Sequence, residues 1–516
     1  MSNNDRWESE VVIVGGGLDV STDALTQGTT ASGSARILQN FESALEGGYR
    51  RISGYAKYDT STVPGDSNAP ILGVKAALGG VFAARYITGS TDNAIYYSSG
   101  SGWGTKINTA ARPGGVVKAR FISYSISEPV IVVCDGVNRA LKYNGTTDTL
   151  INGSGAPTNP KYAEVTYSRL VLGGYSANPS AISISAPNDD EDFTSGAGAV
   201  ELSVGDEIVG LKTFRETLYI FCKRSIWALA GNTTDTFAIV PVAKSIGCLS
   251  GDSIQEVGGD LLFLAPDGLR SIAATQKIGD VDLGLLSKNI QPILRPLISG
   301  KSDYLYSSCA VRAKSQYRMF INDASVERTD AFGVIGKLNN SSTGSAYAWS
   351  TIRGMPAYCA DSEYVDNQEI AVFGDITNGY VYRQEQGNDF DGNNITAQYC
   401  SPQLTFKDAS LRKVMQKATI YTQSEGSTNV ELSVQLDFQE STILQPPSVT
   451  LTQTGSFPEY GTAIYDTSVY GSLQFPVFRQ NLIGSCFTAA FCYTSIGGAS
   501  YRIDSYQIQY GPKGRR

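Results

Sequence analysis

The sequence predicts an all-β protein: a β-propeller of six or seven blades with an additional β-sandwich domain. From about residue 70 to 385, short apolar or alternating runs are broken every ~8–12 residues by clusters of Gly, Asn, Asp or Ser, as strands joined by turns require. The 54 Gly and 29 Tyr agree, because Gly supplies positive φ in tight turns and Tyr suits a pleated surface. The apolar units recur every ~40–50 residues, which is the period of propeller blades.

These units share one order: an apolar strand, a turn, a second strand and a polar end. The clearest five span 71–99, 116–145, 163–187, 207–231 and 253–274. Two less regular candidates follow at 307–354 and 369–384, so the expected blade count is six or seven. Each unit of a propeller buries its faces only against its neighbours, and long helices are not expected.

Two regions depart from this rhythm. In 276–301, Leu283, Leu286 and Ile290 follow steps of three and four, which predicts one or two helical turns against the β core before two prolines interrupt the pattern. Beyond about residue 395, longer alternating strands such as 413–423 predict a separate β-sandwich. The expected domains are an extended segment entering the propeller at 1–65, the propeller at 66–394 and the β-sandwich at 395–516.

The balance of charges and the lack of histidine restrict the function. With 41 Lys and Arg against 49 Asp and Glu, the 516-residue chain carries a net charge of −8, which argues against a protein that holds DNA by a basic surface. The chain has 0 His, which excludes Ser/His/Asp and Cys/His catalysis and His-ligated zinc. Carboxylate chemistry stays open.

The eight cysteines form no C-x-x-C pair, and several lie in apolar strand-like runs such as Phe221-Cys222. We interpret them as buried free thiols of a protein made in a reducing cytosol, in preference to a disulfide framework or a zinc site. The first ten residues, MSNNDRWESE, lack the basic start and apolar core of a signal peptide, and no apolar run approaches the ~20 residues of a membrane helix. We therefore expect no membrane anchor.

Three motifs resemble ligand sites only in part. In VVIVGGGLDV (11–20), Val20 stands where a dinucleotide-binding loop has its third glycine, and no helical period follows, so a glycine turn is favoured over a nucleotide site. Residues 389–393 copy the first half of a calcium loop but lack its Gly and its Glu. Propeller glycosidases need only two carboxylates, but the Ser-x-Asp-x-Gly-x-x-Trp box of sialidase-type propellers is absent. We expect no catalytic residue, no cofactor, no metal and no enzymatic activity.

One stretch is unusually acidic. No Lys or Arg occurs from Pro187 to Glu207. The stretch is compatible with a cation site, an acidic wall or a solvated loop face, and the residues alone favour the last. Its carboxylates are Asp189, Asp190, Glu191, Asp192, Glu201, Asp206 and Glu207.

An ordered series of loose motifs along the chain resembles a known family. Near the N-terminus these are Gly16-Gly17-Leu18-Asp19, Asn40-Phe41 and the run from Gly47 to Gly54. In the middle they are Tyr167-Ser168-Arg169-Leu170 with Asn178-Pro179, then Ile208-Val209-Gly210-Leu211-Lys212. The most specific series is Gly247-Cys248, Asp252-Ser253, Gly258-Gly259, Phe263-Leu264 and Asp267-Gly268-Leu269. The C-terminal ones are Arg412-Lys413, Tyr465-Asp466 and Gly514-Arg515-Arg516. In this order they look like the tail nozzle, or packaged-DNA stabilisation, proteins of short-tailed phages, including their tail tubular relatives.

The resemblance implies a propeller with an added β-sandwich, assembled as a ring of usually six copies below the adaptor proteins that sit on the portal. Such a ring extends and closes the channel through which duplex DNA leaves the capsid, without sequence-specific binding. It further implies a structural protein of the virion tail, made in the host cytoplasm. The implied partners are its own copies, the phage adaptor (head-completion) protein, and tail fibre, spike or needle proteins.

Two sets of residues then become candidate sites. The seven carboxylates named above are expected to line the bore, because an acidic wall repels phosphates and lets DNA slide. A second set, of basic residues, is expected at subunit or adaptor contacts, with a solvated face as an equal alternative: Arg412, Lys413, Lys417, Lys513, Arg515 and Arg516.

Two other functions are open. The first is a carbohydrate-binding or carbohydrate-cleaving propeller that acts as a receptor-binding tail protein, although only 4 Trp give it little support. The second, an intracellular propeller scaffold, leaves the phage-like motifs unexplained.

Overall fold

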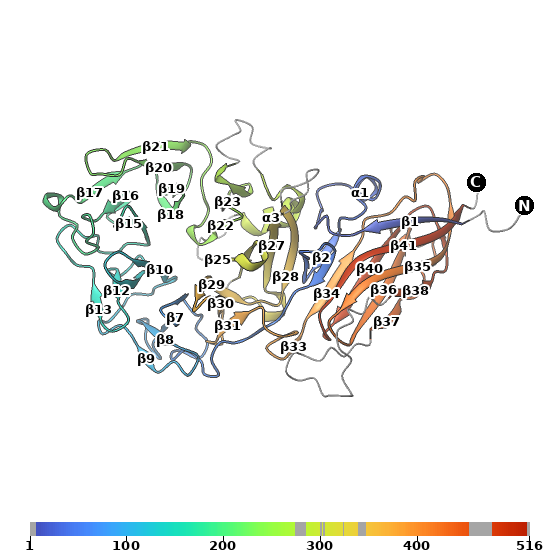
Figure 1. Ribbon diagram of the computed structural model, residues 1–516, viewed down its shortest axis with the longest axis horizontal. Coiled ribbons are helices and arrows are strands. Elements are labelled where there is room, and N and C mark those ends of the chain that lie inside the picture. The colour runs from blue at the N-terminus through green and yellow to red at the C-terminus, as the bar shows by residue number, and fades with distance from the viewer. Residues whose placement is uncertain are drawn as a thin grey trace, which may run out of the picture.

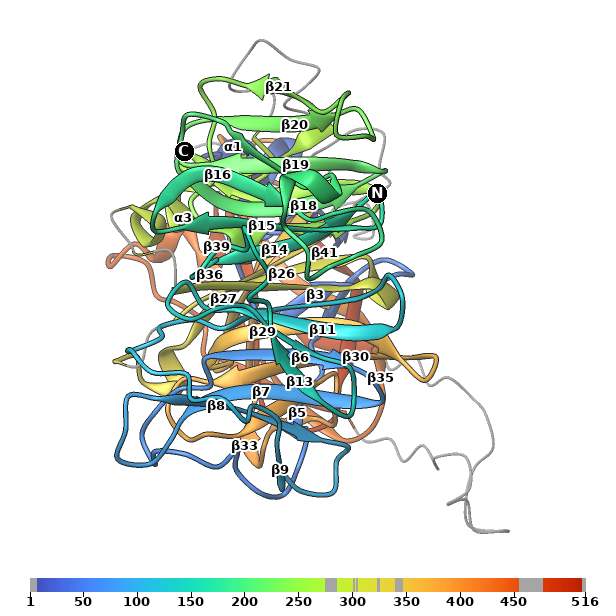
Figure 2. The ribbon, with the colours of Figure 1, turned by 90° about the vertical axis from the view of Figure 1, so that its left-hand side faces the viewer.

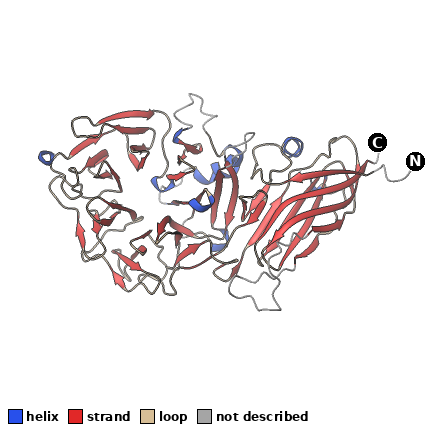
Figure 3. Cartoon of the chain, viewed as in Figure 1, coloured by secondary structure: helices blue, strands red, loops and turns tan. Residues whose placement is uncertain are grey.

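The computed structural model describes residues 7–273, 285–299, 302, 305–322, 325–338, 347–453 and 477–512. Figure 1 shows two bodies, a ring of sheets and an elongated pair of sheets, with both ends of the chain at the tip farthest from the ring. Strands dominate both bodies, and the helices are short (Figure 3). The all-β prediction is therefore confirmed. No described helix has the length and apolar character needed to cross a membrane.

The ring is a β-propeller, as predicted. Four of its blades are separate four-stranded sheets, one is a three-stranded sheet, and two are parts of larger sheets of nine and six strands, which agrees with the expected six or seven blades. Seen from the propeller end, strands of successive blades run side by side (Figure 2). The first blade consists of β6 (Gly73–Ala77), β7 (Gly80–Tyr86), β8 (Asn93–Ser98) and β9 (Thr105–Lys106). The second consists of β10 (Arg120–Ser125), β11 (Pro129–Cys134), β12 (Leu141–Tyr143) and β13 (Asp148–Leu150).

The remaining blades follow in chain order. The third has β14 (Tyr162–Thr166), β15 (Arg169–Tyr175), β16 (Asn178–Ile184) and β17 (Val200–Ser203). The fourth has β18 (Ile208–Phe214), β19 (Thr217–Cys222), β20 (Ile226–Ala230) and β21 (Ala238–Ala243). The three-stranded sheet has β22 (Gln255–Val257), β23 (Asp260–Ala265) and β24 (Gly268–Ser271). The next blade has β25 (Tyr306–Val311), β26 (Gln316–Ile321), β27 (Phe332–Leu338) and β28 (Tyr347–Arg353), and the last begins with β29 (Ala357–Val365), β30 (Gln368–Asp375) and β31 (Val381–Gln384).

The same tight turn joins the first two strands in five of the seven sheets. Each of these turns has two residues with positive φ, the conformation that matches the twist of the strands on either side. Gly258-Gly259 is the turn that the sequence indicates most clearly. The five pairs are Leu78-Gly79, Tyr167-Ser168, Arg215-Glu216, Gly258-Gly259 and Asp366-Asn367.

An N-terminal strand closes the propeller. β5 (Tyr55–Lys57) pairs antiparallel with β31 and so supplies the outer strand of the last blade. Tyr55 stacks on Phe390 with ring centroids 4.8 Å apart and meets Phe373 edge-on at 5.0 Å. The blade that ends the ring therefore depends on residues that precede its first blade.

The helix predicted within 276–301 exists, but it begins where the sequence suggested an interruption. Residues 274–284, with Leu283, lie outside the described residues. The helix α3 (Gln291–Ile298) contains both prolines, and its buried residues are Leu294 and Ile298. Proline is tolerated in a first helical turn, whose N–H groups have no partner within the helix.

A second short helix, α1 (Ala24–Thr30), corrects the expectation that no helix follows the N-terminal glycines. Asp23 caps it, and its carboxylate accepts from the N–H groups of Leu25 and Thr26 at 3.1 and 3.0 Å. The helix has no apolar stripe. Its buried Gln27 instead donates to Ser34 Oγ at 2.7 Å, so a tertiary contact holds it in place.

The elongated body, called here the two-sheet body, combines both ends of the chain. One sheet contains β1 (Glu8–Ile13), β3 (Phe41–Ser43), β4 (Tyr49–Arg51), β35 (Lys413–Ser424), β38 (Val477–Asn481), β39 (Ser485–Cys486) and β41 (Tyr501–Pro512). The other contains β2 (Ile37–Gln39), β34 (Thr396–Cys400), β36 (Thr428–Leu436), β37 (Val449–Gln453) and β40 (Ala489–Ile496). Phe491 of β40 contacts Tyr506 of β41 at 5.6 Å between ring centroids, so the two sheets pack face to face.

The two bodies share one sheet. β2 pairs parallel with β28, so the sheet of the blade β25–β28 continues through β2 and β34 into the two-sheet body. The expected bounds at 66–394 and 395–516 stay predictions, and the strand pairing shows that N-terminal strands take part in both bodies.

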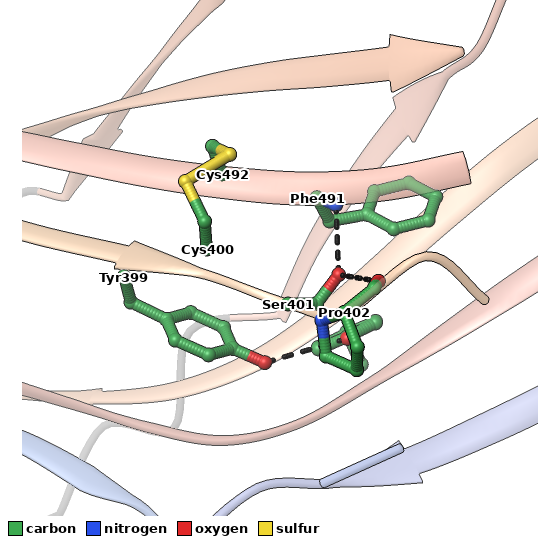
Figure 4. The surroundings of a disulfide bond; sticks show 7 residues. Tyr399, Cys400, Ser401, Pro402, Phe491 and Cys492 are labelled. Atoms are coloured by element: carbon green, nitrogen blue, oxygen red, sulfur yellow. Dashed lines mark hydrogen bonds between the residues drawn. A yellow bond between two sulfur atoms is a disulfide. The ribbon is translucent and has the colours of Figure 1, made fainter. Parts of the chain in front are cut away.

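A disulfide corrects the expectation that all cysteines are free. Cys400 of β34 and Cys492 of β40 face each other in register and are bonded (Figure 4). Next to them, the N–H of Phe491 donates to Ser401 Oγ at 2.9 Å. The other six cysteines are free and buried, as predicted. The sequence alone gives no sign of the pair because the two cysteines are 92 residues apart.

A buried ionic cluster, called here the junction cluster, joins the two bodies. Arg318 in β26 is 1% exposed and contacts both Glu42 of β3 and Glu385, which follows β31. Lys314 contacts the same two carboxylates, at 2.6 Å from Glu42. Burial by itself would raise the pKa of Glu385, but the positive charges of Arg318 and Lys314 have a larger, opposite effect. They hold the pKa of this carboxyl at about 2. The cluster therefore connects β3, β26 and the last blade.

The junction cluster predicts a large effect of Arg318→Met. The variant leaves the buried Glu42 and the half-buried Glu385 with one cation, which costs up to about 3–5 kcal/mol in the free energy of unfolding at pH 7. In the wild type, the stability that Glu385 contributes is complete above its unfolded pKa and is lost as pH falls toward about 2, so the difference between variant and wild type shrinks in acid. Urea unfolding at pH 7 and pH 3 measures both effects. The exposed Arg412→Met is the control, and an Arg318→Met protein as stable as this control contradicts the assignment.

The disulfide predicts a count of reactive thiols. In denaturant without reductant, the wild type should give six titratable thiols per chain, and eight after reduction. The double variant Cys400→Ser/Cys492→Ser should give six in both conditions. Eight thiols in the unreduced wild type would show that Cys400 and Cys492 are not bonded.

Candidate functional site

The centre of the propeller holds a polar cavity of about 250 Å³. Residues from the inner parts of all seven sheets contribute to its wall. Its charged lining residues are Lys75, Lys118, Arg120, Glu164, Lys212, Asp252, Arg312, Asp361 and Glu363. The sequence did not single out any of these as a site, because isolated charges in short strands look like solvated positions until the blades are arranged in a ring.

Ion pairs between side chains of different blades line this cavity. Arg120 of the second blade reaches Asp252, which precedes β22, with two hydrogen bonds of 3.0 and 2.8 Å. Lys75 of the first blade lies 3.3 Å from both Asp361 and Glu363 of the last blade. Cations of one blade therefore hold carboxylates of another, and the propeller centre is spanned by side chains.

Lys118 spans the centre in a different way. Its ammonium donates to the backbone carbonyls of Tyr306 at 3.1 Å and Tyr358 at 2.5 Å, and it lies 4.7 Å from the Tyr358 ring centroid. These carbonyls belong to the blades β25–β28 and β29–β31, so one lysine of the second blade fixes two blades opposite it.

The ion pairs change the acidity of the cavity groups. Burial alone raises the pKa of Glu363, but the ammonium of Lys75 outweighs it, and the pKa of this carboxyl is lowered. Burial alone lowers the pKa of Lys75, but Asp361 and Glu363 outweigh it and raise that pKa. Both shifts favour the ionised forms of Lys75 and Glu363, which are bonded to each other.

The acidic stretch lies on the outer part of the third and fourth blades and does not line the cavity. Asp190 is buried between blades, where it accepts from Lys142 Nζ at 2.7 Å and from the Tyr124 hydroxyl at 2.8 Å. Glu191 lies 3.1 Å from the same ammonium. Burial and Asp190 raise the pKa of Tyr124. Asp190 is therefore a contact between the second and third blades.

The other carboxylates of the stretch bind local partners. Asp189 accepts from the backbone N–H groups of residues 191 and 192, and Asp192 accepts from Thr194 Oγ1 at 2.7 Å, which lowers its pKa. Glu201 accepts from Asn178 at 3.0 Å.

Two further cations from outside the stretch offset its charge. Glu207 lies 2.6 Å from Lys223, and Asp206 lies 3.7 Å from Arg224. Together with Lys142, they make this surface less negative than the sequence of 187–207 suggests. Asp190 is buried between blades and so cannot line a bore, and a position on the bore of a ring stays a prediction for the other six carboxylates.

The predicted contact residues near the C-terminus separate into three groups. Arg412 is exposed and donates to Ser485 Oγ at 3.1 Å, and Lys417 is half-buried on the outer face of its sheet. Lys413 is a correction: it is 1% exposed, and its ammonium donates to the carbonyls of Thr405 at 2.7 Å and Phe487 at 3.1 Å, so it cannot meet another subunit. Burial lowers the pKa of Lys413. The other three predicted residues, Lys513, Arg515 and Arg516, lie outside the described residues.

No family model matches the chain, and no curated protein matches it. Among solved structures, the extracellular domain of the one component system BT4673 from B. thetaiotaomicron matches 68% of this chain with 8% identity and a TM-score of 0.37, and this chain spans only 45% of that protein. BBS1N in complex with ARL6DN matches 64% of this chain and 97% of its own, with 10% identity and a TM-score of 0.33. A glycoside hydrolase family 43 arabinoxylan arabinofuranohydrolase from Bacillus subtilis matches 89% of this chain and 98% of its own, with 10% identity and a TM-score of 0.24.

This comparison corrects the expectation of a chain without enzymatic activity. One of the matched structures is a glycoside hydrolase. The expectation is therefore withdrawn. Within the described residues, no group of three or more metal-binding side chains gathers at one place.

The N-terminal edge of the two-sheet body predicts an unusual pH dependence. Glu10 Oε2 is buried without a hydrogen-bond partner, and burial raises the pKa of this carboxyl despite Lys407 and Lys413 nearby. A raised folded pKa means that stability falls as pH rises through that pKa. Glu10→Gln should therefore unfold at higher urea than the wild type at pH 7, by on the order of 1 kcal/mol, the cost of one unsatisfied buried group.

The neighbouring Glu8 provides a control of opposite sign. Lys407 and Tyr510 donate to its carboxylate and lower its pKa, so Glu8→Gln should lose stability at pH 7 and differ less from the wild type in acid. Urea unfolding from pH 4 to pH 8 measures both variants. Equal responses of the two variants would contradict the burial of Glu10.

Proposed function

We propose that the chain is a structural protein of a short-tailed phage virion, the tail nozzle whose ring extends and closes the DNA ejection channel. The observation that carries this proposal is the position of the motifs on which the family resemblance rests. The N-terminal motifs lie at the junction between the propeller and the two-sheet body, and each has a structural task there.

Gly17 allows a close approach of two backbone segments. It has a φ of +81°, and a Cβ at this position would come within 2.9 Å of the backbone of Ala348 and Trp349. The next residue, Leu18, donates its N–H to the carbonyl of Trp349 at 2.7 Å. The glycine motif therefore serves the contact between the N-terminal segment and β28, which explains why no nucleotide-binding loop forms.

Asn40 and Arg51 connect distant segments at the same junction. The Asn40 side chain donates to the carbonyls of Arg353 at 3.1 Å and Thr396 at 2.9 Å, which join the propeller to β34. The buried Arg51 donates to the carbonyls of Gly497 at 2.6 Å and Gly498 at 2.7 Å, at the end of β40. These motifs therefore form the contacts that attach the two-sheet body to the propeller. This supports membership of the nozzle family, for which the resemblance implies a propeller with an added β-sandwich.

The small polar cavity in the propeller centre supports a channel that lies outside the single chain. A cavity of about 250 Å³ that is spanned by Arg120 and Lys118 has no room for duplex DNA, which is roughly 20 Å wide. The bore of the proposed ring therefore lies between copies of the chain, and the propeller contributes its outer surface to the wall.

Electron microscopy of the purified protein tests the proposal. We expect a closed ring with rotational symmetry and a central hole of at least ~20 Å, either for the protein alone or together with its candidate adaptor ring. A chain that stays monomeric in both samples, at concentrations well above those of assembly in other rings, would refute the nozzle.

The alternative, a carbohydrate-binding or carbohydrate-cleaving propeller on a phage tail, has one observation in its favour. The central cavity gathers four carboxylates, Glu164, Asp252, Asp361 and Glu363, and glycoside hydrolysis needs two. A monomeric protein that binds or cleaves host surface polysaccharide, and loses this ability in Asp361→Asn, would replace the nozzle with this alternative.

A further inference from the structure

The apolar surface of the chain is concentrated away from the propeller. Thirteen of the eighteen large hydrophobic side chains that are exposed in the described part of the chain lie outside residues 52–394. Among them, Ile13 is 76% exposed and Val11 is 56% exposed, and both belong to β1. An apolar strand at the border of a sheet is a place where another chain can add.

Among the described residues, β1 pairs with β41 on one side only, and no strand lies along its other edge. At the Ile13 end of that edge, Gly33 lies against the Ile13 carbonyl, so the open part of the edge is at Ser9 and Val11. At the opposite border of the same sheet, β38 pairs only with β35 among the residues that the structure describes, which do not include 454–476. Within the described residues, the sheet therefore ends on each side in a strand with one strand partner.

The outward residue rows of this sheet run from one edge to the other. Ile13 faces Ser505, Ser505 faces Tyr421, and Tyr421 faces Val477. Tyr421 and Val477 are 38% and 40% exposed, so three of the four residues in this row, all except Ser505, are exposed hydrophobic side chains. Residues that face each other in an antiparallel sheet point to the same side, and this row and the two beside it make up the outer face. The two further rows are Val11, Gln507, Thr419 and Arg479, then Ser9, Gln509, Lys417 and Asn481.

The outer face differs in charge from the rest of the molecule. It carries two cations, Lys417 and Arg479, and no carboxylate, whereas the whole chain has a net charge of −8. When a second copy continues these rows, uncharged side chains of its β1 meet the two cations, and no pair of like charges opposes the contact.

The blades show how this chain protects edges that do not pair. The outer strands of four blades each carry a charge or a proline, devices that discourage the addition of a strand. These residues are Lys106 in β9, Asp148 in β13, Glu201 in β17 and Pro241 in β21. β1 carries Glu8 and Glu10, but its outward row of Ser9, Val11 and Ile13 has no charge and no proline.

We infer that β1 of one copy pairs with β38 of the next copy, so that this sheet continues from subunit to subunit. β1, β41, β35 and β38 are successively antiparallel, and β1 of the next copy would run antiparallel to β38 as well. Such a contact joins two different surfaces, and repeated by rotation it closes a ring. The inference deepens the proposed nozzle function, because it names the surfaces through which its copies meet.

A cysteine pair tests the contact without disturbing its apolar residues. Ser9→Cys and Asn481→Cys occupy the two ends of one row, and Cα atoms of facing residues in an antiparallel pair lie about 4.5–5.5 Å apart, within the range of a disulfide. All native cysteines are buried or bonded to each other, so the added thiols are the accessible ones. We expect the double variant to give a ladder of covalently linked chains under mild oxidation, and each single variant to give at most dimers.

A charged variant tests the same contact by assembly. Val11→Lys/Ile13→Lys should raise the concentration needed for ring formation at least about tenfold, as loss of apolar contacts at an interface centre does. The matched control is Val137→Lys/Val240→Lys, on exposed propeller residues that are 43% and 40% exposed, and it should assemble as the wild type does. Thermal unfolding verifies that both variants are folded.

The outcomes separate the inference from the function. A ladder together with weakened assembly of the charged β1 variant supports the β1–β38 contact. Wild-type rings without a ladder, and unaffected by charges in β1, overturn the inference and leave the nozzle function intact. A wild type that never assembles, alone or with its adaptor, refutes both.

Discussion

The mutual position of the two bodies depends on the buried charges of Glu42, Arg318 and Glu385. Removal of such groups from water costs several kcal/mol per ion, and this cost is offset only when all partners are present in good geometry. The three residues come from β3, from β26 and from the end of the last blade, so the cluster is satisfied only when the N-terminal hairpin, an inner blade and the closing blade have all reached their places. A misplaced hairpin would leave Arg318 or its carboxylates buried and unpaired. The cluster therefore favours one arrangement of the two bodies over others, more than it adds to the free energy of unfolding.

The N-terminal segment is the structural link that makes this arrangement possible. Within fewer than sixty residues it provides β1, β3 and β4 to one sheet, β2 to the shared sheet and β5 to the last blade. β1 pairs with β41, at the far end of the sequence, and a pairing so distant along the chain is slow to form because the loop must close first. The last blade is complete only with β5, and the two-sheet body is complete only when β1 and β41 have paired. This explains why the motifs of the N-terminal segment are small or polar residues with defined backbone contacts, such as Gly17 and Asn40, in place of a long apolar run.

The propeller could be predicted from the sequence because the residue patterns that define each blade lie within one short stretch of the chain. Alternating residues and turn clusters within ~40–50 residues define each blade. In the three-stranded blade, Gly258-Gly259 marks the hairpin between β22 and β23 directly. Other turns of the same shape, such as Arg215-Glu216, carry no glycine, so their geometry follows from the strands around them. The disulfide, the junction cluster and the burial of Lys413 could not be predicted, because each depends on residues that are distant in sequence, such as Cys400 and Cys492 or Lys413 and Phe487, and that meet only in the folded chain. The charges of the propeller centre belong to the same class.

The distribution of charge places any DNA path outside the individual propeller. In the centre, Arg120 with Asp252 and Lys75 with Asp361 and Glu363 satisfy one another, and opening this cavity would break contacts between blades that hold the ring of sheets together. On the outer blades, Lys142, Lys223 and Arg224 offset part of the acidic stretch. What is left to act at a distance is the net charge of −8 on each chain, which every copy would add to the wall of the proposed ring. A weak, distributed repulsion of this kind suits a channel through which a polyanion has to slide, because no single contact is strong enough to hold a phosphate.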